Sequence, residues 1–395
     1  MATGSTSASK DPARPSSSTS ELFGALYARG GVAAEVGDRA WLQAMLDVEA
    51  ALARACARAG LVPDAAADAI AAACRADGYD IAALGREAAD SGTPVIALVR
   101  ALRERVGTDA AAHVHRDATS QDVLDTAAML VAARALGPLL VDAAATAEAV
   151  AALAERHDDT LVAGRTLLQQ ALPMSFGLKA AGWLIGVEDG IAGLVAVRDG
   201  TLAVQMGGPV GDRDPAIAAR VAAELGLVEP VIPWHTHRAR PVALAAALGV
   251  LTGALAKVAR DVTLLAQDEV AEVREGGDPA RGASSSMPHK HNPVAAVSTL
   301  ACAERVPGLV ATMLAAMTQE HERAAGAWQA EWGTLTELLR LTGSAAAWSR
   351  DLLEHLHVDA ERMRRNAETL PERGGGGAAS TLVERALSAH RAARR

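Results

Sequence analysis

Apolar residues recur along most of the chain at the spacing of three and four residues that is typical of amphipathic helices. In the segment 38–61 they share one stripe with a single acidic residue, and the stripe consists of Leu42, Met45, Leu46, Glu49, Leu52 and Ala53. The same spacing predicts helices at 65–77, 123–136, 139–156, 175–197, 215–225, 241–273, 293–317 and 333–355. We therefore expect a chain built from helices, several of them long.

The longest run without a charged residue is 241–256, which lies between Arg240 and Lys257. The run is short for a membrane span and rich in Ala and Gly. It predicts the centre of a buried bundle helix, no face of which meets water. The whole predicted helix, 241–273, would be about 50 Å long at about 1.5 Å per residue.

Composition narrows the class of protein. The chain has 395 residues, of which 50% are hydrophobic and only 3% aromatic. A core of Ala, Leu, Val and Gly suits closely packed helices better than sheets, so the predicted fold class is all-α. The formal net charge of −9 argues against nucleic acid as a partner, and an anionic substrate must therefore find a local positive site.

The cysteines and the N-terminus bear on the compartment. The 3 cysteines are scattered, which indicates a reducing environment and no disulfide framework. Residues 1–20 are rich in Ser, Thr and Pro and lack the apolar middle of a secretory signal, so we expect a disordered tail. Together these features predict a cytoplasmic protein without a membrane partner.

A polar stretch at 284–293, SSSMPHKHNP, is the first candidate for chemistry. The density of Gly and Pro around it predicts a loop, and Asn292 and Pro293 are expected as the N-cap and first residue of the next helix. Lys290 and the positive helix end could bind a carboxylate and make a nearby serine unusually acidic. The alternative is a polar surface linker, but linkers rarely carry such a mixed set of side chains.

A second polar cluster precedes the predicted helix at 123–136. Ser120 is a plausible N-cap, and Thr119 and Ser120 with their amides would form a neutral cradle for an anion. An ordinary capped helix explains the same spacing equally well. His115, taken alone, is more often structural than catalytic.

These two clusters resemble signature blocks of the fumarase/aspartase superfamily. The loop is similar to the G-S-S-x-M-P-x-K-x-N pattern, with Ala283 at the position of the Gly and a glycine one place earlier. The second cluster is similar to H-x-G-x-T-S-x-D, in which the Thr-Ser pair binds a substrate carboxylate. Asp117 replaces the Gly of that block, and we expect it to turn away, to pair with Arg116 or to alter affinity.

Further blocks extend the resemblance over nearly the whole chain after residue 20. The segment 164–173, GRTLLQQALP, is similar to G-R-T-H-L-Q-x-A-x-P, with Leu167 in place of the His. The family's Q-x-G-G-A-A-G-T loop has Asp212 at its last position here, and W-H-T-x-R-D-R has Ala239 in place of its Asp. The segment 319–332 is particularly similar to bacterial 3-carboxy-cis,cis-muconate cycloisomerases, as is the pattern that begins at 38.

The resemblance implies a homotetramer whose long central helices assemble into one bundle and whose active sites lie where three subunits converge. The expected parts are a tail (1–20), an N-terminal helical domain (21–108), a central long-helix bundle (109–355) and a shortened C-terminal helical segment (356–395). The long apolar helices favour such an assembly independently, because they are more hydrophobic than one subunit needs.

The activity implied is the interconversion of 3-carboxy-cis,cis-muconate and 4-carboxymuconolactone, in protocatechuate breakdown. A small polycarboxylate would be the substrate and no cofactor or metal is expected. His235 and His237 make a poor metal site because no third ligand is near in sequence. The resemblance assigns catalysis to Ser284, Lys290 and His115, and substrate binding to Thr119, Ser120, Arg165, Thr166, Gln169, Asn292, His235, Arg323 and Trp328.

Leu167 agrees with lactone chemistry. An enzyme that expels an amine gains from an acid that protonates the leaving group. A carboxylate leaves unaided, because the pKa of its conjugate acid is about 4. Two alternatives remain: another lyase of the superfamily, such as an adenylosuccinate lyase, or a catalytically idle helical scaffold. For Trp328, a corner between helices stapled by two Trp side chains is an equally good interpretation.

Overall fold

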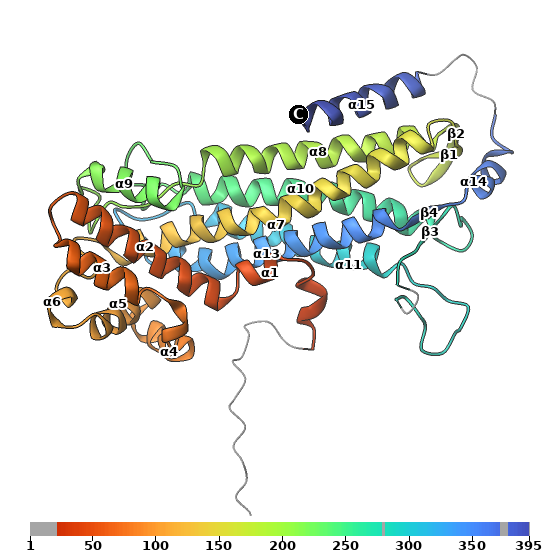
Figure 1. Ribbon diagram of the computed structural model, residues 1–395. Coiled ribbons are helices and arrows are strands. Elements are labelled where there is room, and N and C mark those ends of the chain that lie inside the picture. The colour runs from red at the N-terminus through yellow and green to blue at the C-terminus, as the bar shows by residue number, and fades with distance from the viewer. Residues whose placement is uncertain (1–21, 279–280, 372–377, 395) are drawn as a thin grey trace, which may run out of the picture.

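The structure, a computed structural model, describes residues 22–278, 281–371 and 378–394. The predicted all-α class is confirmed, because the strands found among these residues form only two small two-stranded sheets (Figure 1). The tail predicted at 1–20 lies outside the described residues, so the structure does not test it.

Short helices make up the N-terminal part of the chain. They are η1 (Gly24–Tyr27), α1 (Val32–Glu35), α2 (Asp38–Arg58), α3 (Asp64–Ala73), η2 (Ala76–Gly78), α4 (Ile81–Ser91), α5 (Pro94–Arg105) and α6 (Thr108–Ala111). Helix α2 packs against α3, against α7 and against α9 (Pro215–Leu225). This part therefore rests on one end of the long helices (Figure 1).

Four long helices lie side by side and form the body of the molecule (Figure 1). They are α7 (Ser120–Arg156), α8 (Phe176–Gly200), α10 (Ala239–Leu265) and α13 (Ala327–Glu354). Helix α7 has 37 residues and α10 has 27, which correspond to about 55 Å and about 40 Å at about 1.5 Å per residue. Helices α11 (Val294–Ala303) and α12 (Val306–Ala315) pack on α10 and α13.

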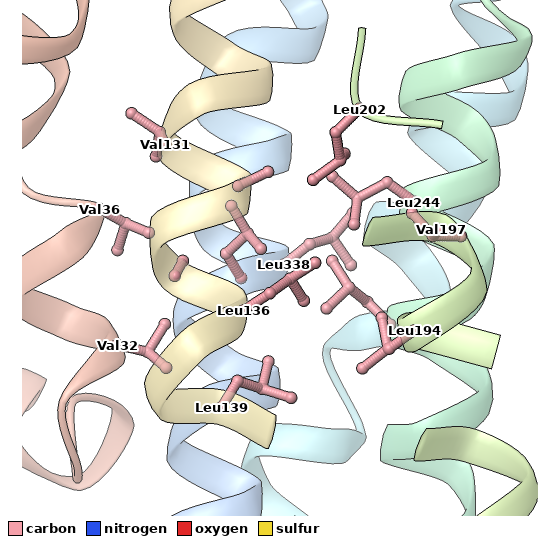
Figure 2. Packing of buried hydrophobic residues seen from close by; sticks show 14 of the residues in the cluster. Val32, Val36, Val131, Leu136, Leu139, Leu194, Val197, Leu202, Leu244 and Leu338 are labelled. Atoms are coloured by element: carbon pink, nitrogen blue, oxygen red, sulfur yellow. The ribbon is translucent and has the colours of Figure 1, made fainter. Parts of the chain in front are cut away.

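The core between these helices consists mainly of small and aliphatic side chains, as the composition predicts. Figure 2 shows Leu136 and Leu139 of α7 facing Leu194 of α8 and Leu338 of α13, all of them buried. At Gly190 the backbones of α8 and α10 come so close that a Cβ would lie 2.8 Å from Cα of Leu251. Glycine is therefore required where these two helices meet.

The long helices are more apolar than the core needs. By length and composition alone, four segments could cross a membrane, namely α7, α8, α10 and Val294–Ala315. In each of them, about a third to a half of the most apolar stretch is buried within the chain. The expectation that no face of the run 241–256 meets water is corrected here, because Val250 within that run is 60% exposed in the chain. Exposed apolar side chains such as Val250 and Leu314 remain on these helices.

Several predicted boundaries were wrong. Helix α7 runs through Pro138, because a proline inside a well-packed helix removes one hydrogen bond without ending the helix. The helix predicted at 241–273 ends at Leu265, and the following turn leads into β3 (Val273–Glu275), which pairs with β4 (Leu356–Val358). The helix predicted at 293–317 is divided into α11 and α12 at 304–305.

An antiparallel hairpin was missed altogether. It consists of β1 (Leu161–Thr166) and β2 (Gln169–Ser175), and it connects α7 to α8. After β4 the chain ends in α14 (Ala360–Ala367) and α15 (Ala379–Ala393), the second of which packs along α8 (Figure 1). Residues 372–377, between these two helices, lie outside the described residues.

Candidate active site

The serine loop is closed at its base by Asn292. The carbonyl oxygen of Gly282 accepts hydrogen bonds from the backbone N–H of Asn292 and from its Nδ2, both at 2.9 Å. Gly282 has φ of 81°, and a Cβ there would lie 2.3 Å from the carbonyl oxygen of Asn292. Only glycine fits this close approach, which explains a glycine at 282 beside Ala283.

Ser284 lies inside the closed loop with two amides directed at its hydroxyl. Its Oγ accepts from the backbone N–H of Met287 at 3.1 Å and of Ser286 at 3.4 Å. Amides in this position stabilise negative charge on the oxygen. Lys290 is exposed, and its ammonium has no partner within the described part of the chain.

The helix that follows the loop already holds a carboxylate of the chain itself. Helix α11 begins at Val294, so Pro293 occupies the N-cap position predicted for Asn292. The carboxylate of Glu275 accepts from the N–H of Ala295 at 2.7 and 3.0 Å and from that of Ala296 at 3.3 Å. The expectation that this helix end would bind a substrate carboxylate is therefore corrected. Burial raises the pKa of Glu275, and the hydrogen bond from Ala295 opposes that shift.

The cradle at the start of α7 is organised by one buried carboxylate, that of Asp122. Thr119, rather than Ser120, is the N-cap, and Ser120 is the first helical residue. Asp122 is fully buried and accepts five hydrogen bonds, from the N–H of Thr119 (3.0 Å), of Gly207 (2.9 Å) and of Gly208 (2.8 Å), from Gln205 Nε2 (3.3 Å) and from His235 Nε2 (2.9 Å). Asp122 thus joins three segments that are distant in sequence.

His115 and Asp117 both adopt left-handed backbone conformations, with φ of 61° and 51°. That conformation explains why a glycine suits the position of Asp117. Of the three outcomes expected for Asp117, pairing is the one observed, because its carboxylate is exposed and bonds Arg116 Nε at 3.0 Å. His115 instead points inward, and its Nδ1 lies 2.6 Å from Oε1 of the buried Glu49.

Three residues predicted to contact substrate lie on the hairpin. Arg165 is held by Glu272, since its Nη1 and Nη2 bond the two carboxylate oxygens at 2.9 and 2.8 Å. Thr166 pairs with Gln169 at the tip, and both are exposed. The turn between them is made by Leu167 and Leu168 at φ of 51° and 65°, with exposed fractions of 96% and 75%.

The last three predicted residues lie near the cradle. His235 is buried and bonded to Asp122, so it holds the cradle together from within. Arg323 is exposed, and it donates to Gln121 Oε1 at 3.3 Å and to the carbonyl of Pro209 at 3.2 Å. Trp328 lies on α13. It is buried, and its indole Nε1 donates to Asp125 at 2.9 Å.

The staple interpretation of Trp328 agrees with a second contact. Its ring lies edge-on to that of Trp332, with 4.9 Å between the ring centroids. Trp328 and Trp332 stand one turn apart on α13, and the stack stiffens the start of that helix.

These groups form two clusters at opposite ends of the molecule. The cradle lies at the first residues of α7 and α10, whereas the hairpin and the base of the serine loop lie beyond the far ends of the same helices (Figure 1). The separation is about 40 Å, the length of α10 at about 1.5 Å per residue. One chain therefore does not bring Ser284 to Thr119 and Ser120.

A cavity of about 310 Å³ lies behind the serine loop, and most of its lining residues are charged or polar. Among the lining residues are Arg274, Glu275, Arg281, His291, Asn292 and His357. Glu49, Gln205 and Glu275 were missed as site residues. Their sequence signals are weak, and only Glu49 stood out, as the acidic residue of an apolar stripe.

A helical body with a serine loop at one end and a capped Thr-Ser cradle at the other defines a lyase-type subunit. Residues 19–308 match the lyase family, and the chain belongs to this family, the fumarase/aspartase superfamily. A 3-carboxy-cis,cis-muconate cycloisomerase from Bradyrhizobium diazoefficiens is 46% identical over 362 residues, which are 89% of this chain and 80% of that relative.

Two further comparisons bear on function. The crystal structure of the 3-carboxy-cis,cis-muconate lactonizing enzyme from Pseudomonas putida matches with a TM-score of 0.85 and 40% identity, over 95% of this chain and 89% of that one. A nitrosuccinate lyase from Streptomyces davaonensis is 43% identical over 354 residues, which are 85% of this chain and 74% of that relative.

Proposed function

We propose that the protein is a cycloisomerase that interconverts 3-carboxy-cis,cis-muconate and 4-carboxymuconolactone. The observation that carries the proposal is the closed serine loop, in which two amides face Ser284 Oγ. Relatives that are 41–47% identical bear the cycloisomerase name, which supports this choice of reaction within the family. We further propose a cytoplasmic enzyme of aromatic catabolism.

The reaction is an internal addition. In the lactonising direction an oxygen of one substrate carboxylate bonds to a carbon of the C=C bond, and the electron pair of that bond moves to the adjacent carbon. Negative charge there delocalises into the neighbouring carboxylate until Ser284 delivers its proton to the carbon. In the reverse direction the serinate removes that proton and the C–O bond breaks, so that no other reactant is consumed.

The residues have distinct roles in this scheme. Thr119, Ser120 and Lys290 stabilise the charge that develops on the substrate. Asn292 instead holds the loop closed, because its amide N–H is bonded to Gly282. Arg165 positions the hairpin through its bonds to Glu272.

The site is proposed to assemble from several copies in a homotetramer. A second copy packed antiparallel along the long helices would bring its cradle end to the serine loop of the first. An apolar groove of about 610 Å³ between α10 and α12, lined by Val250 and Leu314 among others, gives such a copy a surface to cover. The hairpin tip would enter the site of a neighbour, where its exposed leucines would be buried.

A nitrosuccinate-type elimination is the second candidate. It is favoured by the 43% identity to the nitrosuccinate lyase and by Leu167. Nitrite, like a carboxylate, is a weakly basic leaving group that needs no acid to protonate it. The two candidates therefore share the serine loop and differ in the substrate that is bound.

Incubation of the purified protein with 3-carboxy-cis,cis-muconate tests the proposal. With the wild-type protein we expect the ultraviolet absorbance of the diene to fall. Ser284→Ala should abolish this decrease, while analytical sedimentation should show the same oligomer as for the wild type. Ser285→Ala is the matched control, since it removes a neighbouring hydroxyl that has no hydrogen bond to any residue that the structure describes, and it should retain most turnover. Nitrite release from nitrosuccinate without any diene decay would reject the cycloisomerase, and full activity of Ser284→Ala would remove Ser284 from the mechanism.

A further inference from the structure

A buried carboxylate stands behind His115. Glu49 lies on the apolar stripe of α2 and is 1% exposed. Its Oε1 is 2.6 Å from Nδ1 of His115, whereas its Oε2 is buried and has no hydrogen-bond partner within the described residues. A carboxylate in such surroundings is strongly destabilised unless a positive group pairs with it.

The backbone of His115 is held in a form that keeps this pair together. Its φ of 61° is uncommon for a residue other than glycine and persists only where the surroundings enforce it. The preceding Val114 is buried and its carbonyl accepts from Arg103, while the carbonyl of His115 accepts from the N–H of Ala118. With Nδ1 directed at Glu49, Nε2 is the remaining polar atom of the ring, and it has no partner in the part of the chain that the structure describes.

The charges around the ring favour its protonated form. Burial by itself lowers the pKa of His115, but the charge and hydrogen bond of Glu49 raise it, and the net pKa lies above the ordinary value of 6.5. Asp122 of α7 adds to the increase and Arg103 of α5 opposes it. Arg116 and Asp117, the adjacent exposed charges, neutralise each other in their own ion pair.

We propose that Glu49 is a positioning residue that keeps His115 as an imidazolium and directs its Nε2–H to a carboxylate of the substrate, beside Thr119 and Ser120. The inference rests on the proposed function. It gives His115, which the resemblance assigned to catalysis, the role of a fixed positive charge, and proton transfer stays with Ser284. The cradle then gains the positive charge that Thr119 and Ser120 lack.

Glu49→Gln separates this role from a structural one, because glutamine keeps the shape and one hydrogen bond but loses the charge. We expect the pKa of His115, measured from the pH dependence of deuterium exchange at the imidazole C2, to be lower in Glu49→Gln than in the wild type. Fragment masses distinguish His115 from His113 in the tryptic peptide. Asp47→Asn is the matched control, since Asp47 is on the same helix but bonds Gln43 and Arg134.

Kinetics give the second readout. A charged hydrogen bond to substrate corresponds to a roughly tenfold change in KM or more. For the wild type, KM for 3-carboxy-cis,cis-muconate should rise as the pH passes upward through the pKa of His115, and in Glu49→Gln the rise should begin at lower pH, with kcat little changed at low pH. Asp47→Asn should follow the wild-type profile.

The outcomes distinguish this inference from the proposed function. An unchanged pKa of His115 in Glu49→Gln overturns the inference, whatever substrate the enzyme accepts. A lowered pKa with the same KM profile in both proteins overturns the contact with the substrate carboxylate. A wild-type protein that does not convert carboxymuconate rejects the proposed function, while the exchange measurement still decides whether Glu49 sets the protonation of His115.

Discussion

Replacing Asp122 by Asn should disorganise the cradle without removing any substrate contact. Asp122 is isosteric with Asn but accepts hydrogen bonds through both oxygens. Oδ2 accepts from the N–H of Thr119 at 3.0 Å and of Gly208 at 2.8 Å, and Oδ1 takes the other three bonds. If the NH₂ group of the asparagine takes the place of Oδ2, it faces two N–H donors. If the amide is turned over so that the NH₂ group takes the place of Oδ1, it faces three.

The magnitude follows from that geometry. Each buried donor left without an acceptor costs about 1–3 kcal/mol, so the two donors of the better orientation give a loss of about 2–6 kcal/mol. That loss is a large fraction of the stability of an ordinary domain. Because Gly207, Gly208 and His235 are held by the same carboxylate, the damage should extend to the position of Thr119 and Ser120.

Urea unfolding followed by circular dichroism, at one protein concentration for all variants, measures the free energy of unfolding. Asp199→Asn is the control, because Asp199 is an exposed carboxylate paired only with Arg198, and it should change stability by less than about 0.5 kcal/mol. In steady-state kinetics Asp122→Asn should raise KM more than it lowers kcat. An unfolding midpoint equal to that of Asp199→Asn would refute the reasoning.

Two more predictions concern the serine loop. Gly282→Ala places a Cβ 2.3 Å from the carbonyl oxygen of Asn292 and should open the loop. Turnover should then fall roughly a hundredfold, because a shift of about 1 Å in a reacting group costs that much, while the melting temperature changes little. Turnover equal to that of the wild type would contradict the closure of the loop by Asn292. Glu275 has a raised pKa, so the folded state binds its proton more tightly than the unfolded state, and its contribution to stability declines as the pH rises from the ordinary glutamate pKa through the raised one. The melting temperature of the wild type relative to Glu275→Gln should therefore decrease over that pH range, and a difference that increases with pH would contradict the raised pKa of Glu275.

The helical class and the two polar clusters could be predicted from sequence because both depend on local chemistry. The apolar spacing identifies α2 directly, and the glycines and prolines around Ser284 leave the chain little choice but a loop. The boundary at Pro138 was wrong because packing against neighbouring helices outweighs the local preference of a proline. Local rules describe what a segment prefers, whereas α7 is stabilised mainly by the helices around it.

The hairpin was missed for a related reason. Two-residue hairpin turns with positive φ normally use Asn and Gly, and here they use Leu167 and Leu168. No turn signal marks such a pair in sequence. The separation of the two clusters was equally hidden, because it depends on the continuity of α7 and on the direction in which α10 returns along it.

The structure also changes how an anionic substrate can be held. The sequence offered the start of α7 and the start of α11 for its carboxylates, and we propose His115 as a third place. In the folded chain each of them already holds a carboxylate of the protein, from Asp122, Glu275 and Glu49 respectively. These side chains fix the geometry but also cancel much of the local positive charge, in a chain whose net charge is −9. Lys290, whose ammonium has no partner within the described residues, lies at one end of the molecule, and His115, with the Nε2–H that we propose for substrate binding, lies at the other. A compact polycarboxylate cannot reach both in a single chain, which supports the proposal that a second copy completes the site.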